Sequence, residues 1–64
     1  MNLHQLRVFY EVASARSFTA AAAKLHLTQP AATWQVKRLE DACGVRLLDR
    51  AGRRITLTEE GKVL

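Results

Sequence analysis

The 64-residue sequence contains little cysteine, proline, glycine or aromatic side chain. Its single cysteine, Cys43, has no second thiol for an internal disulfide and no Cys or His partner at zinc-ligand spacing. No apolar run approaches the roughly 18 residues that span a bilayer, and no basic, apolar and small-residue leader opens the chain. Neither a membrane protein nor a secreted one is therefore expected. A domain this small must rely on its apolar core, on a partner or on more chain.

The residue patterns of common catalytic sites are also missing. His4 and His26 do not form an HExxH pair, and no serine lies in a Gly-x-Ser-x-Gly turn. There is no glycine-rich phosphate loop. Glu40 and Asp41 are adjacent, so on a helix they diverge. These absences predict that the chain is not an enzyme and that these residues bind no cofactor.

Positive charge is in excess. Lys and Arg number 10 against 6 Asp and Glu, which gives a formal net charge of +4. A small basic domain attracts polyanions, either nucleic acid or an anionic membrane surface. The positions of the basic residues must decide between these partners.

Two helices are predicted before residue 28. Apolar residues spaced by three and four predict an amphipathic helix over 2–16; they are Leu3, Leu6, Phe9, Tyr10 and Ala13. Ser17 is a suitable N-cap for a second helix that runs to Leu25. The alanines of this second segment predict close packing against a neighbouring helix.

A third helix is predicted over 28–43. Thr28 can cap it, Pro30 falls in its first turn, and Gly44 ends it. One stripe along it is apolar and predicted to be buried: Ala32, Val36, Leu39 and Cys43. Two helices joined by a short turn, with small residues on the first, form a helix-turn-helix.

The pattern then changes to short strands. Leu47-Leu48 and 55–57 flank the turn-prone Ala51-Gly52, which predicts a two-stranded β wing over 47–57. Thr58 can cap a fourth helix that starts with two glutamates. The predicted fold class is mainly α: a winged helix-turn-helix with three helices, the wing and the start of a fourth linker helix.

The face of the third helix opposite the apolar stripe carries the only tryptophan. Pro30, Trp34, Lys37 and Asp41 share this face, because about 100° separates successive helical residues. Tryptophan normally contributes a large buried area. Trp34 therefore either packs against a neighbouring loop or a second copy, or it contacts another molecule.

Residues around Trp34 fit DNA. Gln29 can bond adenine, and Thr33 can touch a thymine methyl or a phosphate. Lys37 and Arg38 can reach phosphates or guanine. The helix N-terminus at Thr28 and Gln29 offers N–H groups to a phosphate.

The wing adds positive charge. Three arginines lie within five residues without an acid among them: Arg50, Arg53 and Arg54. Beside a recognition helix, they are predicted to reach the phosphate backbone or an adjacent minor groove. The remaining spread-out cations are assigned to solvated faces or local pairs; these are Arg7, Arg16, Lys24 and Arg46.

A more specific pattern extends over nearly the whole chain. It comprises Leu6-Arg7, Phe9, Val12-Ala13, Ser17-Phe18-Thr19, Ala21-Ala22, Leu25-His26, Thr28-Gln29-Pro30-Ala31, Leu39-Glu40, Gly44-Val45-Arg46-Leu47-Leu48, Arg50, Arg53, Leu57-Thr58 and Gly61. This pattern resembles the N-terminal DNA-binding domain of LysR-type bacterial transcriptional regulators.

The resemblance implies a DNA-binding domain at residues 1–58, with the helix of about 28–43 in the major groove of double-stranded DNA. The family's contacts correspond to Gln29, Pro30, Thr33 and position 34, and to Arg50 and Arg53 on the wing. Together with the residues argued from chemistry, the predicted DNA-binding set is Thr28, Gln29, Pro30, Thr33, Trp34, Lys37, Arg38, Arg50, Arg53 and Arg54.

The resemblance also implies that residues 59–64 begin a long dimerisation helix. A homodimer is then expected on a pseudo-palindromic operator, with tetramers of the full-length protein. A C-terminal domain that binds a small-molecule inducer is expected outside this chain, which looks truncated. A cytoplasmic bacterial protein without a membrane partner is expected.

Three positions depart from the family. Trp34 stands where arginine is common, so one charged DNA contact is replaced, while Ala32 and Leu48 replace valine and phenylalanine and are predicted to lie in the core. The alternative function is a winged-helix module that binds protein or RNA through the Trp34 face. Steep salt dependence and discrimination between duplexes distinguish DNA binding from this alternative.

Overall fold

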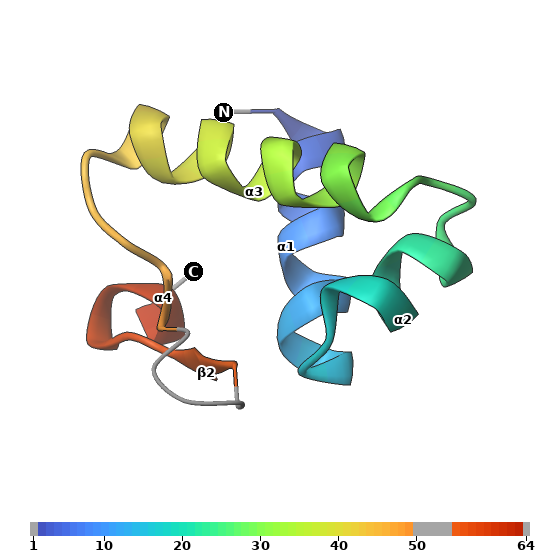
Figure 1. Ribbon diagram of the computed structural model, residues 1–64. Helices are drawn as coiled ribbons and strands as arrows, with labels where there is room; N and C mark the ends of the chain where they lie inside the picture. Colours follow the sequence, from blue (N-terminus) through green and yellow to red (C-terminus); the bar gives the residue numbers. More distant parts are fainter. Residues whose placement is uncertain (1, 50–54, 64) are drawn as a thin grey trace.

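The computed structural model describes residues 2–49 and 55–63. Its elements in chain order are α1 (Leu3–Ala15), α2 (Phe18–Lys24), α3 (Gln29–Cys43), β1 (Leu48–Asp49), β2 (Thr56–Leu57) and α4 (Glu59–Val63) (Figure 1). The two strands pair antiparallel, with Leu48 opposite Leu57 and Asp49 opposite Thr56. The predicted winged helix-turn-helix is confirmed, with each strand beginning one residue later than predicted.

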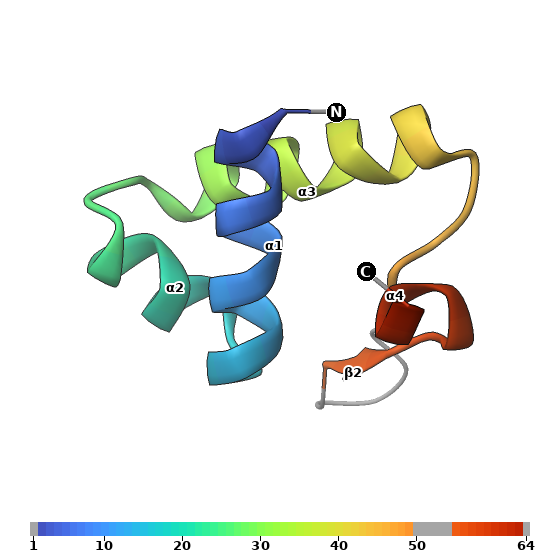
Figure 2. The same ribbon diagram turned by 180° about the vertical axis from the view of Figure 1, so that it is seen from behind.

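The three longer helices enclose the core, and the strands and α4 lie to one side. Figure 1 shows α3 extending across one edge of the molecule with α1 crossing behind it, and Figure 2 shows the same crossing from the other side. The molecule is flattened, with extents of 27 × 27 × 16 Å. Because α1 and α2 pack on one side of α3, its opposite side is left uncovered.

Local capping sets the helix boundaries as predicted. The Ser17 hydroxyl accepts the Ala20 N–H at 3.0 Å and starts α2. The Thr28 hydroxyl accepts the Ala31 N–H at 3.2 Å and starts α3. At the other end of α3, Gly44 adopts a left-handed conformation with φ 73°, which glycine tolerates without a Cβ penalty. These short-range signals were sufficient to place both helices of the helix-turn-helix.

Replacing Ser17 by alanine is expected to lower the free energy of unfolding by about 1 kcal/mol, because the Ala20 N–H loses its cap. In a domain of this size, the midpoint of thermal unfolding by circular dichroism then falls by about 4–8 °C. Ser14→Ala is the matched control, since Ser14 is exposed within α1. An equal fall for both variants would contradict a capping role.

The first helix buries only part of the predicted apolar stripe. Leu3 and Tyr10, expected in its apolar stripe, are 84% and 66% exposed. Phe9 is buried as predicted, and Val8 and Val12, which lie outside the predicted stripe, are fully buried. The difference arises because α1 contacts both α2 and α3, so its core face is set by two neighbours rather than by its own periodicity.

Two polar residues of α1 are buried with partners. Gln5 closes a capping box, in which its N–H donates to the Asn2 side chain at 2.8 Å. Glu11 forms an ion pair with Lys24 of α2 at 3.1 Å. Lys24, assigned to a solvated face or a local pair, thus forms an ion pair that links α1 to α2.

The predicted apolar stripe of α3 is confirmed over most of its length. Ala32, Val36 and Leu39 are fully buried, whereas Cys43 is only half-buried, with a free thiol. The described core consists of Val8, Phe9, Val12, Phe18, Ala21, Ala22, Ala32, Val36, Leu39, Leu47 and Leu48. Two of the three positions that depart from the family, Ala32 and Leu48, thus lie in the core as predicted.

The start of α4 is bound to the segment that precedes β1. The Thr58 N–H donates to the Leu47 carbonyl at 3.0 Å, and its hydroxyl donates to the Arg46 carbonyl at 2.6 Å. The same hydroxyl accepts the Gly61 N–H at 3.0 Å, which is the predicted cap. Thr58 therefore joins α4 and the wing into one unit.

Candidate nucleic-acid interface

The uncovered side of α3 carries the candidate residues of this helix. Trp34 is 55% exposed and lies about 180° around the helix from the buried stripe. Thr33 is half-buried. The other candidates at the start of α3 and along it are exposed: Thr28, Gln29, Pro30, Lys37 and Arg38. All seven predicted residues between positions 28 and 43 are thus at least partly accessible.

The N-terminus of α3 has fewer backbone N–H groups available to bind a phosphate than a helix N-terminus normally offers. The Thr28 hydroxyl already accepts the Ala31 N–H, and Pro30 has no N–H to offer. The Ala32 N–H donates to the Thr28 carbonyl. Within the first turn of this described helix, the Gln29 N–H is what remains for a phosphate. The expected anion contact therefore narrows to this amide and the helix dipole.

Trp34 and Arg38 interact along α3. The Arg38 guanidinium carbon lies 4.8 Å from the centroid of the Trp34 ring. The spacing of four residues places these side chains on adjacent turns of the same face. The guanidinium covers one side of the indole, a cation–π geometry that holds both side chains in a defined arrangement.

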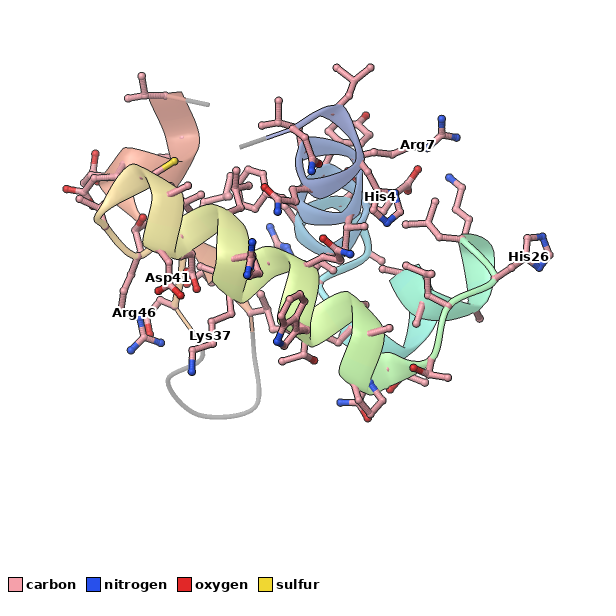
Figure 3. All side chains as sticks on the ribbon, turned by 90° about the horizontal axis from the view of Figure 1, so that it is seen from above. His4, Arg7, His26, Lys37, Asp41 and Arg46 are labelled. Atoms are coloured by element: carbon pink, nitrogen blue, oxygen red, sulfur yellow. The ribbon has the colours of Figure 1, made fainter. Side chains whose placement is uncertain are left out.

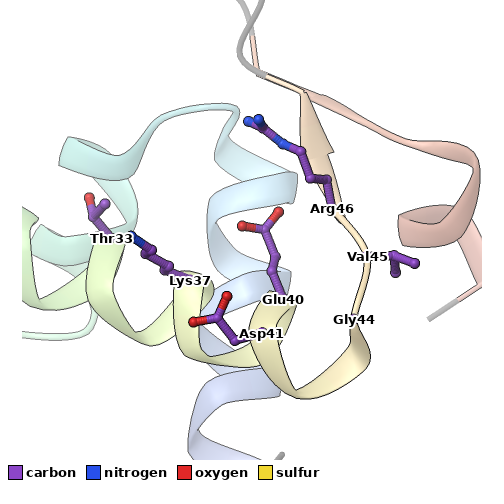
Figure 4. Close-up of a pocket in the computed structure, with 7 residues that line it drawn as sticks. All are labelled: Thr33, Lys37, Glu40, Asp41, Gly44, Val45 and Arg46. Carbon is purple, nitrogen blue, oxygen red and sulfur yellow. The ribbon is translucent and has the colours of Figure 1, made fainter.

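An open concavity of about 760 Å³ lies between the second half of α3 and the segment that leads to the wing. Figure 4 shows its α3 side formed by Thr33, Lys37, Glu40 and Asp41. Its other side is formed by Gly44, Val45 and Arg46. The concavity brings an exposed cation of α3, Lys37, and one of the segment after it, Arg46, next to the candidate face.

Arg46 is the residue of this surface that the sequence did not single out. Figure 3 shows Arg46 on the same side of α3 as Lys37 and Asp41, and all three border the concavity. The sequence assigned Arg46 to a solvated face or a local pair, because it is one of several cations spread out along the chain. The tertiary structure places Arg46 beside α3, because the segment after Gly44 forms the second side of the concavity.

Glu40 has a structural partner. Its carboxylate accepts the N–H groups of Leu47 and Leu48 at 2.8 and 3.2 Å. The sequence rejected Glu40 as a catalytic residue and included it in the family pattern, but predicted no partner for it. The contact fixes the start of the wing against α3, so it sets how two parts of the candidate surface are oriented.

The predicted basic residues of the wing cannot be placed against this surface. Arg50, Arg53 and Arg54 lie outside the described residues. The described strands β1 and β2 flank them in the sequence and pair beside α4. Contact of these arginines with DNA stays a prediction.

Other kinds of site find little support in the described parts of the chain. Residues 2–49 and 55–63 contain no group of three or more His, Cys, Asp or Glu side chains that could hold a metal ion. None of the helices described is both long enough and apolar enough to cross a membrane. A second, more apolar concavity of about 470 Å³ lies between α1 and the β2–α4 segment.

Comparison with known families gives a match over most of the chain. Residues 3–62 match the family described as bacterial regulatory helix-turn-helix protein, lysR family. A RuBisCO operon transcriptional regulator from Allochromatium vinosum is 50% identical over 62 residues, which are 97% of this chain and 20% of the relative. The regulator CfxR from Cupriavidus necator is 49% identical over 61 residues, 95% of this chain and 19% of the relative. The chain thus spans about a fifth of these curated relatives.

Solved structures show the same fold. The DNA-binding domain of BenM in complex with catB site 1 DNA aligns with a TM-score of 0.93 and 41% identity, covering 98% of this chain and 70% of that chain. The DNA-binding domain of CbnR in complex with DNA aligns with a TM-score of 0.92 and 44% identity, covering 98% and 72%. At this level of identity, the backbone of α3 and the strands is shared with domains solved on DNA.

Proposed function

Because this chain belongs to the lysR family of bacterial regulatory helix-turn-helix proteins, we propose that it is the DNA-binding domain of a transcriptional regulator and that it binds double-stranded DNA sequence-specifically through α3. The observation that carries this proposal is the accessible face of α3, where polar and basic side chains surround an exposed tryptophan. The solved complexes of BenM and CbnR domains with DNA support it.

The dimensions of α3 suit the major groove. Its 15 residues extend for about 22 Å, and the groove, about 12 Å wide, admits an α-helix. Pro30 and Trp34 then face the base edges, while Thr33, on one flank, and Arg38, on the other, face the phosphates. Arg46 borders the same surface and adds a cation toward the backbone. The wing arginines Arg50, Arg53 and Arg54 extend this contact in the proposal.

Selection of duplexes from a random pool with the 64-residue chain tests this function. A defined sequence is expected to be enriched and to bind with an affinity that falls steeply as salt rises. Binding without preference among duplexes would contradict sequence specificity. Preference for RNA or for a protein ligand over every duplex would favour the alternative, an interaction module that docks through the Trp34 face.

Lys37→Ala is expected to weaken binding to specific and unrelated duplexes by a similar factor. Its ammonium is exposed on α3 and neutralises a phosphate in the proposed complex, so the slope of log affinity against log salt should decrease by about one unit. Fluorescence anisotropy of a labelled duplex at several salt concentrations measures both effects.

Arg7→Ala is the matched control for this change, because Arg7 is an exposed cation on α1, away from Lys37 (Figure 3), and it lines neither of the two concavities. Its affinity and salt slope are expected to stay close to those of the unchanged chain. A Lys37→Ala variant that behaves like the control would contradict the placement of Lys37 at a phosphate.

A homodimer through the fourth helix is part of the proposal. The apolar concavity between α1 and α4 is lined by Leu6, Phe9, Tyr10, Ala13, Ser14, Leu57, Gly61 and Lys62. Large apolar residues near this side are exposed, including Leu3, Tyr10 and Val63. A second copy that covers this surface would align two α3 helices on a pseudo-palindromic operator. A selected site without two-fold symmetry would contradict this dimer.

The regulatory role also defines what this chain is proposed not to do. The relatives are transcriptional regulators, which supports a domain without catalytic activity or a cofactor of its own. A cytoplasmic location follows from access to bacterial DNA. A small-molecule inducer and assembly into tetramers are proposed for the full-length regulator, in line with relatives about five times as long as the matched region.

A further inference from the structure

The position of Trp34 on α3 is unusual for its chemistry. The indole is the largest apolar group of the helix, yet it lies opposite the buried stripe of Ala32, Val36 and Leu39 and is 55% exposed. A side chain about 180° from the core points along the axis by which a helix enters a groove. In the proposed complex, Trp34 therefore faces the base edges, whereas side chains on the flanks of α3 face the phosphates.

Arg38 restricts how the indole can lie. Its guanidinium carbon is 4.8 Å from the ring centroid, so one face of the indole is covered by a cation of the same helix. The opposite face and the outer edge remain for another molecule. Such stacking strengthens when water is removed from around it. Arg38 thus orients the ring before binding and keeps a positive charge beside it.

The chemistry of the major groove indicates what this ring can contact. Most of the groups exposed on base edges are hydrogen-bond donors or acceptors, and the 5-methyl group of thymine is the apolar one. Indole has one N–H donor and no acceptor, so it cannot form the bidentate pair that arginine forms with guanine. An apolar ring surface held toward the base edges matches the methyl group.

We propose that Trp34 is a specificity-determining residue that contacts the 5-methyl group of a thymine in each half-site, with Arg38 stacked behind it as a positioning residue. This contact presupposes the proposed DNA binding and names the base that the exposed indole selects. The bulk of Trp34 also disfavours bases whose edges present unpaired polar groups to the ring, because these groups lose water without gaining a partner.

Replacement of single thymines by deoxyuridine in a duplex selected with the 64-residue chain tests this contact. Deoxyuridine removes the methyl group and keeps the hydrogen-bonding edge, so the protein itself is unchanged. At one thymine per half-site, affinity is expected to fall about fourfold, the effect of one methyl group no longer buried. At the other thymines of the site, the same replacement is expected to have little effect.

Protein variants assign the effect to Trp34. Trp34→Ala should bind the thymine and deoxyuridine duplexes equally, with an unchanged thermal midpoint, since the ring is outside the core. Trp34→Arg should select a different base at that position. Arg38→Lys, which keeps the charge without the planar stack, should reduce the thymine preference more than the overall affinity. His4→Ala is the control, because this exposed ring on α1 lines neither of the two concavities.

The single tryptophan also provides a direct measurement. Its fluorescence is expected to change when the selected duplex is added, in parallel with binding measured by anisotropy. Tight, sequence-specific binding with unchanged tryptophan emission, or with no thymine sensitive to methyl removal, would overturn the thymine contact and leave the proposed function standing. Absence of duplex binding by a folded chain would overturn the proposed function itself. A large loss of thermal stability in Trp34→Ala would show that the ring is structural and overturn the specificity role.

Discussion

Gly61→Ala is expected to lower the free energy of unfolding by about 1–3 kcal/mol, although alanine is the better helix former. Gly61 is buried in α4, and a Cβ there would overlap the carbonyl oxygen of Leu47. It would also lie 3.2 Å from the Leu57 side chain. Because the main obstacle is backbone rather than a flexible side chain, α4 must move away as a unit.

Three contributions to the free energy of unfolding decide whether Gly61→Ala stabilises or destabilises the domain. Alanine gains about 1 kcal/mol in helix propensity over glycine. The displacement strains the packing by about 1–3 kcal/mol, and it weakens the bond from the Thr58 N–H to the Leu47 carbonyl, worth about another 1 kcal/mol. The second and third effects together exceed the first. The glycine is needed here for space, not for an unusual backbone angle.

Thermal unfolding monitored by circular dichroism measures this change, with a fall in the midpoint of about 10 °C expected. Val63→Ala is the matched control, because Val63 lies in the same helix and is 88% exposed. Its midpoint should change little. A Gly61→Ala variant that is as stable as the unchanged chain would show that α4 does not press on the Leu47 carbonyl.

Glu40→Ala is expected to reduce the free energy of unfolding by about 2–4 kcal/mol, since it leaves two backbone donors without their acceptor. The carboxylate accepts the N–H groups of Leu47 and Leu48, both of which are buried residues. A domain of this size has about 3–5 kcal/mol in total. The variant is therefore expected to be largely unfolded near physiological temperature.

Glu40→Gln separates hydrogen bonding from charge. The amide oxygen of glutamine can still accept from the Leu47 or Leu48 N–H, so about half of the lost stability should return. Asp41→Ala is the control at the neighbouring position, where the carboxylate is exposed on the same concavity. If Asp41→Ala destabilised the chain as much as Glu40→Ala, the effect would come from the general charge of this region and not from the two hydrogen bonds.

Loss of the Glu40 contact should also affect DNA binding. The carboxylate ties the start of β1 to α3, so it sets the orientation of Arg46 and the wing relative to the recognition helix. In the Glu40→Gln variant, specific affinity should fall more than the fraction of folded protein does. Anisotropy at a temperature where the variant is folded distinguishes the two effects.

Short-range signals predicted much of this molecule. Ser17, Thr28 and Thr58 cap helices where the sequence placed them, because a cap depends on residues three positions apart. The stripe of α3 is buried as predicted, since a helix with one apolar face has one way to cover it. The exposure of Trp34 follows from the same periodicity.

Long-range contacts were decided only by the tertiary structure. The core face of α1 was predicted incorrectly at Leu3 and Tyr10. Two helices, α2 and α3, cover α1, and the spacing of apolar residues within α1 does not show where these helices lie. Arg46 joins the candidate surface, and Glu40 binds the wing, through the path of the chain after Gly44. Neither contact has a periodic signature.

By itself, the sequence determined the class of fold, the bounds of the helix-turn-helix and the candidate side chains on α3. The physical reason is that capping and amphipathicity act within one or two helical turns. The tertiary structure decided which neighbours surround these elements. It places the Leu47 carbonyl where a Cβ of residue 61 would lie, the Glu40 carboxylate beside the Leu47 N–H, and the Arg38 guanidinium over the Trp34 ring. These contacts depend on how segments distant in the sequence pack together, and close packing allows few arrangements of their side chains.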